Sequence, residues 1–143
     1  MNKKVRQALI ALGGFLFIVD RLLKYFSIGF LNHRSLLCPF LGWYPSANRG
    51  IAFSIPVPPI LVIIFSLIFI AALFWIYRRD TDKLRRMFIV YILLGAVSNI
   101  IDRLAYGHTL DYFLLVVSVI NIADILIVGG VAGYIFFQTR TTK

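Results

Sequence analysis

Four long apolar runs, separated by polar or proline-containing stretches, dominate the pattern of the chain. They occupy roughly residues 8–26, 60–77, 87–105 and 113–137. A hydrocarbon core about 30 Å thick needs about 20 apolar residues per helix, and each run approaches that length. None alternates with the period of a helix that is half exposed to water. We therefore predict four transmembrane helices in one membrane domain spanning residues 1–143.

The distribution of basic residues predicts how these helices are oriented. The loop 78–86, RRDTDKLRR, is strongly basic, and Lys and Arg also flank both ends of the chain. The positive-inside tendency places this loop and both termini in the cytoplasm. The segment 27–59 then lies outside, and it contains all five prolines, so it cannot be one continuous helix. We expect a small β-rich or irregular flap there, between the first two helices of an otherwise all-α membrane protein.

Composition supports a membrane protein and argues against several other classes. The chain is 60% hydrophobic with a mean hydropathy of +0.87, which leaves too little polar surface for a water-soluble domain. The net charge of +9 is explained by topology, so we expect no nucleic-acid partner. Cys38 is the single cysteine, and neither His33 nor His108 has neighbours with metal-ligand spacing. We expect no metal and no cofactor.

Four of the six acidic residues lie outside the basic loop: Asp20, Asp102, Asp111 and Asp124. The predicted topology places all four toward the outer leaflet, with Asp111 in the outer link and Asp124 about a dozen residues into the fourth run. An ionised carboxylate in hydrocarbon costs on the order of several kcal/mol, so such residues pair, face a bundle interior or take part in chemistry. We expect them to form the functional centre. Asp20 also stands where a signal cleavage site would follow the first run, so we expect that run to remain uncleaved.

Two of these aspartates have predicted partners on their own helices. Asp20 precedes Lys24 by four residues, the favoured spacing and order for a helical ion pair. Asn99, Asp102 and Arg103 share one face of the third predicted helix. Asp102 could pair with Arg103 or with a residue of another helix. Structural support and substrate contact both remain open for Asp20 and Asp102.

The fourth run contains an aspartate without a cation. Asn121 and Asp124 share a helical face, and no basic residue lies within one turn of Asp124. An unpaired buried carboxyl group is costly unless it is protonated or shares a proton, and Asp111 is the available partner. Two carboxyl groups with one proton can activate water and protonate a carbonyl oxygen. This pattern suits aspartic-peptidase chemistry, and proton-coupled transport is an alternative.

Polar residues outside the aspartate cluster give weaker hypotheses. In the motif NRGIAF at 48–53, Gly50 permits a backbone turn and Asn48 offers a donor and an acceptor, as many loops do. A peptidase using Lys24 with a serine, Ser54 or Ser98, is another possibility. It would leave the acidic pair without a role.

The ordered set of polar motifs resembles the lipoprotein signal peptidases, also called signal peptidase II. The motifs are DRLLK at 20–24, NRGIAF at 48–53, GAVSNIIDRL at 95–104, the Asp111-Tyr112 step and NIAD at 121–124. The resemblance implies an aspartic endopeptidase of the bacterial cytoplasmic (inner) membrane. Such an enzyme removes the signal peptide of a prolipoprotein by cutting just before a cysteine that carries diacylglyceryl. A catalytically inactive membrane relative would retain the same motifs.

The resemblance also implies roles for individual residues. Asp111 and Asp124 take the positions of the catalytic pair. Eight residues take substrate-binding or site-supporting positions: Asp20, Lys24, Asn48, Gly50, Asn99, Asp102, Arg103 and Asn121. The expected partners are prolipoproteins and membrane lipids, no cofactor is implied, and we expect a monomer whose active site opens toward the outer leaflet. Leu23, Tyr112 and Ile120 depart from the usual family residues, and the stretch between the two catalytic positions is short.

Overall fold

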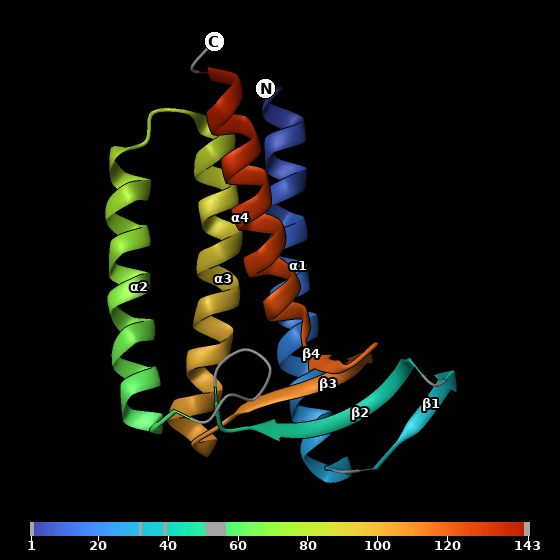
Figure 1. Ribbon diagram of the computed structural model, residues 1–143. Coiled ribbons are helices and arrows are strands. Elements are labelled where there is room, and N and C mark those ends of the chain that lie inside the picture. The colour runs from blue at the N-terminus through green and yellow to red at the C-terminus, as the bar shows by residue number, and fades with distance from the viewer. Residues whose placement is uncertain (1, 32, 39, 51–56, 142–143) are drawn as a thin grey trace.

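The structure is a computed structural model that describes residues 2–31, 33–38, 40–50 and 57–141. It combines four long helices with one antiparallel sheet of strand order β1-β2-β3-β4 (Figure 1). The helices are α1 (Lys3–Ser27), α2 (Pro59–Arg79), α3 (Lys83–Tyr106) and α4 (Ile122–Thr141). The strands are β1 (Ser35–Cys38), β2 (Leu41–Asn48), β3 (Thr109–Leu115) and β4 (Ser118–Ile120), and a short 3₁₀ turn, Ile28–Phe30, follows α1.

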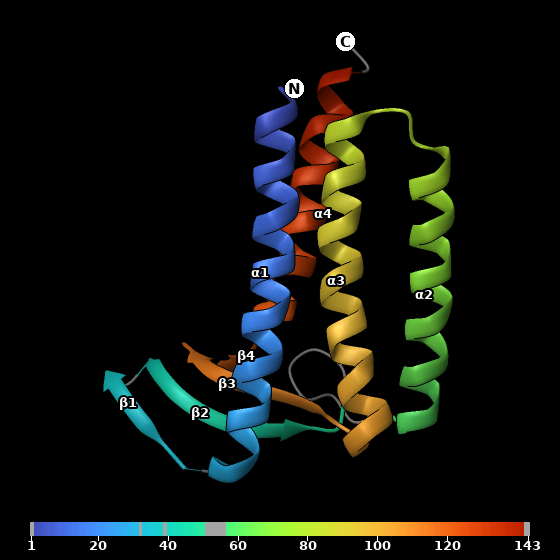
Figure 2. The same ribbon diagram turned by 180° about the vertical axis from the view of Figure 1, so that it is seen from behind.

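The four helices run side by side, and the sheet lies across one end of the bundle. α3 packs against α1, α2 and α4, while α2 stands at the outer side of α3. Both termini lie at the end opposite the sheet, and the view from behind gives the same arrangement (Figure 2). The sheet therefore meets the last turns of α1 and α3 and the first turn of α4 at one end of the molecule.

Within the described part of the chain, three helices are long and apolar enough to cross a membrane: α2, α3 and residues Ile122–Thr139 of α4. α2 has a mean hydropathy of 2.9 and buries only Val62 and Leu73, so large side chains such as Phe65 and Trp75 are exposed. A helix that is apolar on all sides suits a lipid environment. α1 has 25 residues but does not belong to this group, because charged side chains stand at both its ends.

The fourth helix and the sheet correct two of the expectations. α4 begins at Ile122 instead of residue 113, because the residues before it pair as strands β3 and β4. Asp124 consequently lies in the first turn of α4 and not a dozen residues inside it. The chain is not all-α outside a flap between the first two helices, since half of the sheet comes from the connection between α3 and α4. Of the expected flap, residues 51–56 lie outside the described residues.

Close contact between α3 and α4 depends on glycine. A Cβ at Gly95 would collide with the backbone carbonyl oxygen of Ala123 and would lie 2.8 Å from Ile127 Cγ1. Gly130 meets α3 in the same way, since its Cβ would lie 2.9 Å from the Phe88 carbonyl oxygen. The absence of these side chains lets the two backbones approach directly beside the first turn of α4.

We predict that Gly95→Ala separates α3 from α4. The added methyl group meets backbone that cannot turn aside, so the substitution should lower the free energy of unfolding by about 1–3 kcal/mol. Gly129→Ala, on the facing helix α4, is the control, because nothing lies within 4 Å of a Cβ at Gly129. Thermal unfolding in detergent should separate the two variants. Equal melting temperatures would show that the close approach is not needed.

Candidate active site

Asp111 and Asp124 line one cavity of about 380 Å³ beside the sheet. Asp111 is in the middle of β3, and Asp124 is in the first turn of α4. β2 and α3 complete the polar walls, while β4 and α4 supply apolar residues. The other lining residues are Asn48, Asn99, Arg103, Thr109, Ser118, Val119, Ile120, Ile127 and Val128. The structure thus brings together two carboxyl groups that the sequence separates by strands β3 and β4.

Asn121 clamps the two carboxyl groups relative to each other. Its side-chain Nδ2 donates to Asp111 Oδ1 at 2.6 Å, and its backbone N–H donates to Asp124 Oδ2 at 3.2 Å. Its Oδ1 accepts from the backbone N–H of Asp124 at 2.8 Å. This reciprocal pairing is a capping box, the arrangement that starts a helix by satisfying its free N–H groups. The residues that begin α4 are therefore the residues that fix the acidic pair.

Asn48 holds the second oxygen of Asp111. Its Nδ2 donates to Asp111 Oδ2 at 3.0 Å, and its own Oδ1 accepts from the backbone N–H of Gly50 at 3.0 Å. Because the Gly50 N–H can only donate, it fixes which way the Asn48 amide is turned. The Gly50 N–H therefore orients the Asn48 amide, and the amide in turn donates to Asp111.

Asn99 holds Asp124 in the same manner from α3. Its Nδ2 donates to Asp124 Oδ1 at 2.9 Å, and its Oδ1 accepts from the Lys24 ammonium at 2.7 Å. Lys24 is fully buried, and its charge fixes the orientation of the Asn99 amide. Each carboxyl oxygen of the acidic pair therefore receives one N–H group, and the donors themselves are held in place.

A buried charge cluster lies directly behind Asn99. Lys24 Nζ lies 2.8 Å from Asp102 Oδ2 and 3.3 Å from Asp20 Oδ2, and Arg21 Nη1 lies 2.5 Å from Asp102 Oδ1. The ion pair predicted between Asp20 and Lys24 is present. Asp102 does not pair with its neighbour Arg103. Buried charges are tolerated when they are paired and hydrogen-bonded, and these two carboxylates and two cations balance.

Asp20 also supports the beginning of α4. Its Oδ1 accepts from the backbone N–H of Ala123 at 3.2 Å and from the Tyr112 hydroxyl at 2.7 Å. The Tyr112 oxygen accepts in turn from the backbone N–H of Ile122 at 3.0 Å. Ser98 Oγ donates to Asp20 Oδ2 at 2.5 Å. The first backbone N–H groups of a helix have no partner within the helix. In α4 those of Ile122, Ala123 and Asp124 all have side-chain acceptors, and this fixes the position of Asp124.

Sequence reasoning missed three members of this support: Arg21, Ser98 and the Tyr112 hydroxyl. Ser98 lies four residues before Asp102, and Arg21 three before Lys24, so helical spacing could have indicated both. For Tyr112 no local signal exists, because its partner Asp20 lies on α1.

Two polar groups of the cavity are left without internal partners. Among the described residues, none forms a hydrogen bond or ion pair with the Arg103 side chain, which lines the cavity. Thr109 Oγ1 is buried in the described part of the chain without a hydrogen-bond partner. A buried polar group without a partner is costly, so both side chains are suited to contact a bound molecule. Sequence reasoning predicted Arg103 as a site residue and missed Thr109.

The setting of Asp111 raises the pKa of its carboxyl group from 3.8 to about 7. Burial is the main cause, the nearby charge of Asp124 adds to it, and the hydrogen bonds from Asn48 and Asn121 oppose it. Asp111 consequently retains its proton up to a higher pH than an ordinary aspartate does.

The arrangement does not suit catalysis by a serine and a lysine. Ser98 Oγ lies 3.3 Å from Lys24 Nζ, but both side chains have an exposed fraction of 0%. The Lys24 ammonium pairs with the carboxylates of Asp20 and Asp102, and neither Lys24 nor Ser98 lines the cavity that holds the acidic pair. Ser54, the other candidate nucleophile, lies outside the described residues. Within the described ranges, no three His, Cys, Asp or Glu residues gather as metal ligands.

The geometry of two clamped carboxyl groups can be compared with known proteins. Residues 12–140 match the family model described as signal peptidase (SPase) II. The chain belongs to the signal peptidase II family. It is 34% identical to the lipoprotein signal peptidase of Bartonella tribocorum over 73% of this chain and 69% of that protein. It is 31% identical to the lipoprotein signal peptidase of Allorhizobium ampelinum over 86% of this chain and 82% of that protein. It is 30% identical to the lipoprotein signal peptidase of Clostridium novyi over 88% of this chain and 93% of that protein.

Solved structures support the same fold for this member of the signal peptidase II family. A bacterial membrane enzyme determined at 2.3 Å resolution superposes with a TM-score of 0.84, covering 96% of this chain and 90% of that one at 24% identity. A second bacterial membrane enzyme, at 1.9 Å, gives a TM-score of 0.78 over 92% of each chain. The resemblance predicted from the motifs is confirmed, and the chain is a membrane aspartic peptidase.

We predict that Lys24→Met destabilises this signal peptidase II site by removing the cation that holds its supporting residues. Asp20 would lose its cation, Asp102 would keep only Arg21, and Asn99 would be free to turn away from the acidic pair. Removing one partner of a buried ion pair typically costs about 3–5 kcal/mol, so the melting temperature in detergent should fall strongly. Lys4→Met is the matched control, since Lys4 is exposed on the same helix and should change stability by less than about 0.5 kcal/mol. Equal stability of the two variants would contradict a supporting role for Lys24.

Proposed function

We propose that Asp111 and Asp124 are the catalytic pair of a lipoprotein signal peptidase. The substrate is a prolipoprotein, cleaved just before a cysteine that carries diacylglyceryl. The observation that carries the proposal is that both carboxyl groups line one cavity and are clamped by a single residue, Asn121. The family match and the relatives named lipoprotein signal peptidase support this substrate class.

The proposed reaction uses the proton that Asp111 holds near neutral pH. A water molecule between the two carboxyl groups loses a proton to the Asp124 carboxylate and attacks the scissile carbonyl carbon. Asp111 donates its proton to the carbonyl oxygen, which gives a tetrahedral diol. Asp124 then gives the proton it took from water to the departing amine as the C–N bond breaks, and one hydroxyl of the diol returns a proton to Asp111, which leaves a carboxylic acid. Since coupled acids titrate as a pair, this division describes the resting state that the setting of Asp111 favours.

The remaining cavity residues position the substrate and the acidic pair. The Arg103 side chain and the Thr109 hydroxyl have no hydrogen-bond or ion-pair partner among the described residues, so we assign them to hydrogen bonds with the backbone of the bound peptide. Asn48, Asn99 and Asn121 orient the carboxyl groups. Asp20, Lys24 and Asp102 do not line the cavity, and we assign them a positioning role through Asn99 and the first turn of α4.

We further propose that all four helices, α1 included, cross the bacterial cytoplasmic membrane. Four crossings agree with the two termini lying at one end (Figure 1). The basic loop between α2 and α3 lies at that same end, which the positive-inside tendency assigns to the cytoplasm. The sheet and the cavity then lie at the outer leaflet, where a diacylglyceryl substrate can enter sideways. Apolar cavity residues such as Ile127 and Val128 suit that substrate, and we propose that the protein acts as a monomer.

We predict that Asp111→Asn and Asp124→Asn each abolish cleavage. Loss of an acid or base typically costs about 10²- to 10⁴-fold in rate, and here the pair acts as a unit. The assay is cleavage of a diacylglyceryl prolipoprotein by the full chain reconstituted in vesicles. Asp82→Asn is the matched control, because Asp82 caps α3 in the basic loop and Asn can do the same.

Two outcomes would overturn this assignment. Cleavage at the wild-type rate by both variants would show that the acidic pair is not catalytic. Wild-type protein that is inert on every lipidated precursor would instead favour the proton-coupled transporter or the inactive relative.

We predict that activity falls as the pH rises above about 7. The pKa of Asp111 is raised to about 7, so above that pH the proton needed for the carbonyl oxygen is lost and both carboxyl groups are charged. The pKa of this carboxyl group is 3.8 without the folded setting and about 7 within it, so the folded state binds an extra proton between these two pH values. The free energy of unfolding should therefore fall as the pH rises from 3.8 to about 7. The measurement is kcat/KM between about pH 5 and 9.

Asn48→Ala tests the cause of this pH dependence. The hydrogen bond from Asn48 stabilises the charged form of Asp111 and lowers its pKa, so removing it should move the falling limb to higher pH. Ser46→Ala, on the same strand and with a smaller change, should leave the limb in place. A limb that stays fixed or moves to lower pH in Asn48→Ala would contradict the assignment of the titration to Asp111.

A further inference from the structure

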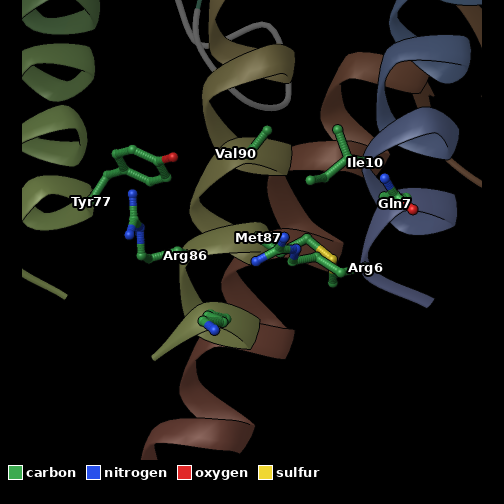
Figure 3. A pocket seen from close by; sticks show the side chains of 8 residues that line it. Arg6, Gln7, Ile10, Tyr77, Arg86, Met87 and Val90 are labelled. Atoms are coloured by element: carbon green, nitrogen blue, oxygen red, sulfur yellow. The ribbon is translucent and has the colours of Figure 1, made fainter. Parts of the chain in front are cut away.

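A second cavity, of about 260 Å³, lies at the opposite end of the bundle from the active site (Figure 3). α1, α2 and α3 all contribute to it, and three of its lining residues are cations: Arg6 from α1, and Lys83 and Arg86 from α3. Catalysis assigns no role to any of them. The end of the bundle is the one that carries both termini (Figure 1).

The three cations of this basic cavity are not neutralised within the protein. None of them forms an ion pair among the described residues. The two aspartates at this end are already engaged: Asp80 pairs with Arg85 at 3.0 Å, and Asp82 accepts from two backbone N–H groups at the start of α3. Among the described residues, the cavity therefore concentrates three positive charges, and none of them is paired with a carboxylate.

Ordinary topology signals do not explain this convergence. Basic residues that only set orientation extend separately into water, as Lys3, Lys4 and Arg78 do at the same end. Arg86 is instead half-buried, with its guanidinium carbon 4.3 Å from the centre of the Tyr77 ring. Figure 3 shows Arg86 beside Tyr77 and Arg6 at the other side of the cavity. Contact with an aromatic ring fixes the position of the guanidinium group, and a fixed guanidinium group is suited to bind an anion.

The apolar part of the lining indicates which anion fits. Ile10, Met87 and Val90 line the cavity together with the cations, Gln7 and Tyr77, and Met87 is only 4% exposed. A free phosphate gains nothing from such a wall, whereas the phosphodiester of a lipid continues into glycerol and acyl chains that would cover it. Basic pockets between transmembrane helices are the usual setting for anionic lipid head groups.

We propose that Arg6, Lys83 and Arg86 bind the phosphodiester of an anionic phospholipid. In the proposed orientation this lipid belongs to the cytoplasmic leaflet, but the chemistry of the contact is the same for either leaflet. The site is separate from the peptidase cavity and takes no part in its reaction. Lipid bound there spans α1, α2 and α3, and joins the helices at the end where no sheet holds them.

The test is lipid binding by the full chain in detergent, measured by native mass spectrometry. Phosphatidylglycerol, phosphatidylcholine and inorganic phosphate are titrated separately. The wild type should bind phosphatidylglycerol at least about tenfold more tightly than phosphatidylcholine, since only the former has a net negative head group. Equal retention of the two lipids by the wild type would overturn the proposal without any variant.

The variant combines Arg6→Gln, Lys83→Gln and Arg86→Gln. Each nearby Lys or Arg strengthens attachment to anionic lipid by roughly fivefold, so phosphatidylglycerol binding should weaken on the order of a hundredfold. The control combines Lys3→Gln, Lys4→Gln and Arg78→Gln, which removes the same charge outside the cavity and should retain binding. Equal loss in both triple variants would reduce the effect to net charge and overturn the site.

Inorganic phosphate separates the two sources of the anion. At concentrations that saturate a free-phosphate site it should not displace phosphatidylglycerol from the wild type. Full displacement would identify a soluble phosphate as the ligand and overturn the lipid assignment. If the triple variant does not fold, Arg86→Gln alone, compared with Arg78→Gln, gives the same contrast with about a fivefold loss.

Discussion

The ammonium group of Lys24 lies at the centre of the molecule's polar end and connects its parts. It pairs with Asp20 on its own helix and with Asp102 on α3, and it fixes the amide of Asn99. Through Asp20 it reaches the first turn of α4, and through Asn99 it reaches the acidic pair. A full positive charge in a site with no exposure requires such partners, so the charge and its neighbours form one unit.

This unit explains why the carboxyl groups can be held without being neutralised. Arg21 and Lys24 are already paired with Asp20 and Asp102, and the hydrogen-bond path from Lys24 to Asp124 runs through the neutral amide of Asn99. Asp111 and Asp124 receive neutral amide and backbone N–H groups as hydrogen-bond donors. Neutral donors fix the position of a carboxyl group with a smaller effect on its proton affinity than a contact cation. A pair that shares a proton needs this combination of rigid placement and free protonation.

The periodic and local features of the fold were predictable from the sequence. Apolar runs indicated α1, α2 and α3 to within a few residues, and the four-residue spacing indicated the pair of Asp20 and Lys24. Strands β3 and β4 were not predictable, because residues 113–120 are apolar and contain no Gly, Pro or Asn to mark their turn. The turn instead places Val116 at a φ of 59°, a conformation that a β-branched residue rarely adopts. A strand that pairs with β2 depends on partners about 70 residues away, which no local pattern encodes.

The same distance limit applies to the candidate site. The family motifs indicated five residues that line the cavity: Asn48, Asn99, Arg103, Asp111 and Asp124. The contacts of Arg21 and Tyr112 had no such signal, because they join α1 to α3 and to β3. A hydroxyl on Tyr112 has a purpose only once β3 is folded against α1. Sequence spacing therefore identifies which residues carry chemistry, and the tertiary fold decides which of them touch substrate and which hold the others.

Charge is divided unequally between the two ends of the bundle, and the division follows from what each end must do. By sequence, ten of the fifteen basic residues but only two of the six aspartates flank the termini or lie in loop 78–86. The sheet end, with the other four aspartates, is therefore almost neutral despite its many charged groups. Because the net charge there is small, the proton affinity of Asp111 depends mainly on its burial and on the nearby charge of Asp124. Among the described residues at the opposite end, Arg6, Lys83 and Arg86 form no ion pair, so the orienting charge of a membrane protein is also available there to bind the anionic lipids that surround it.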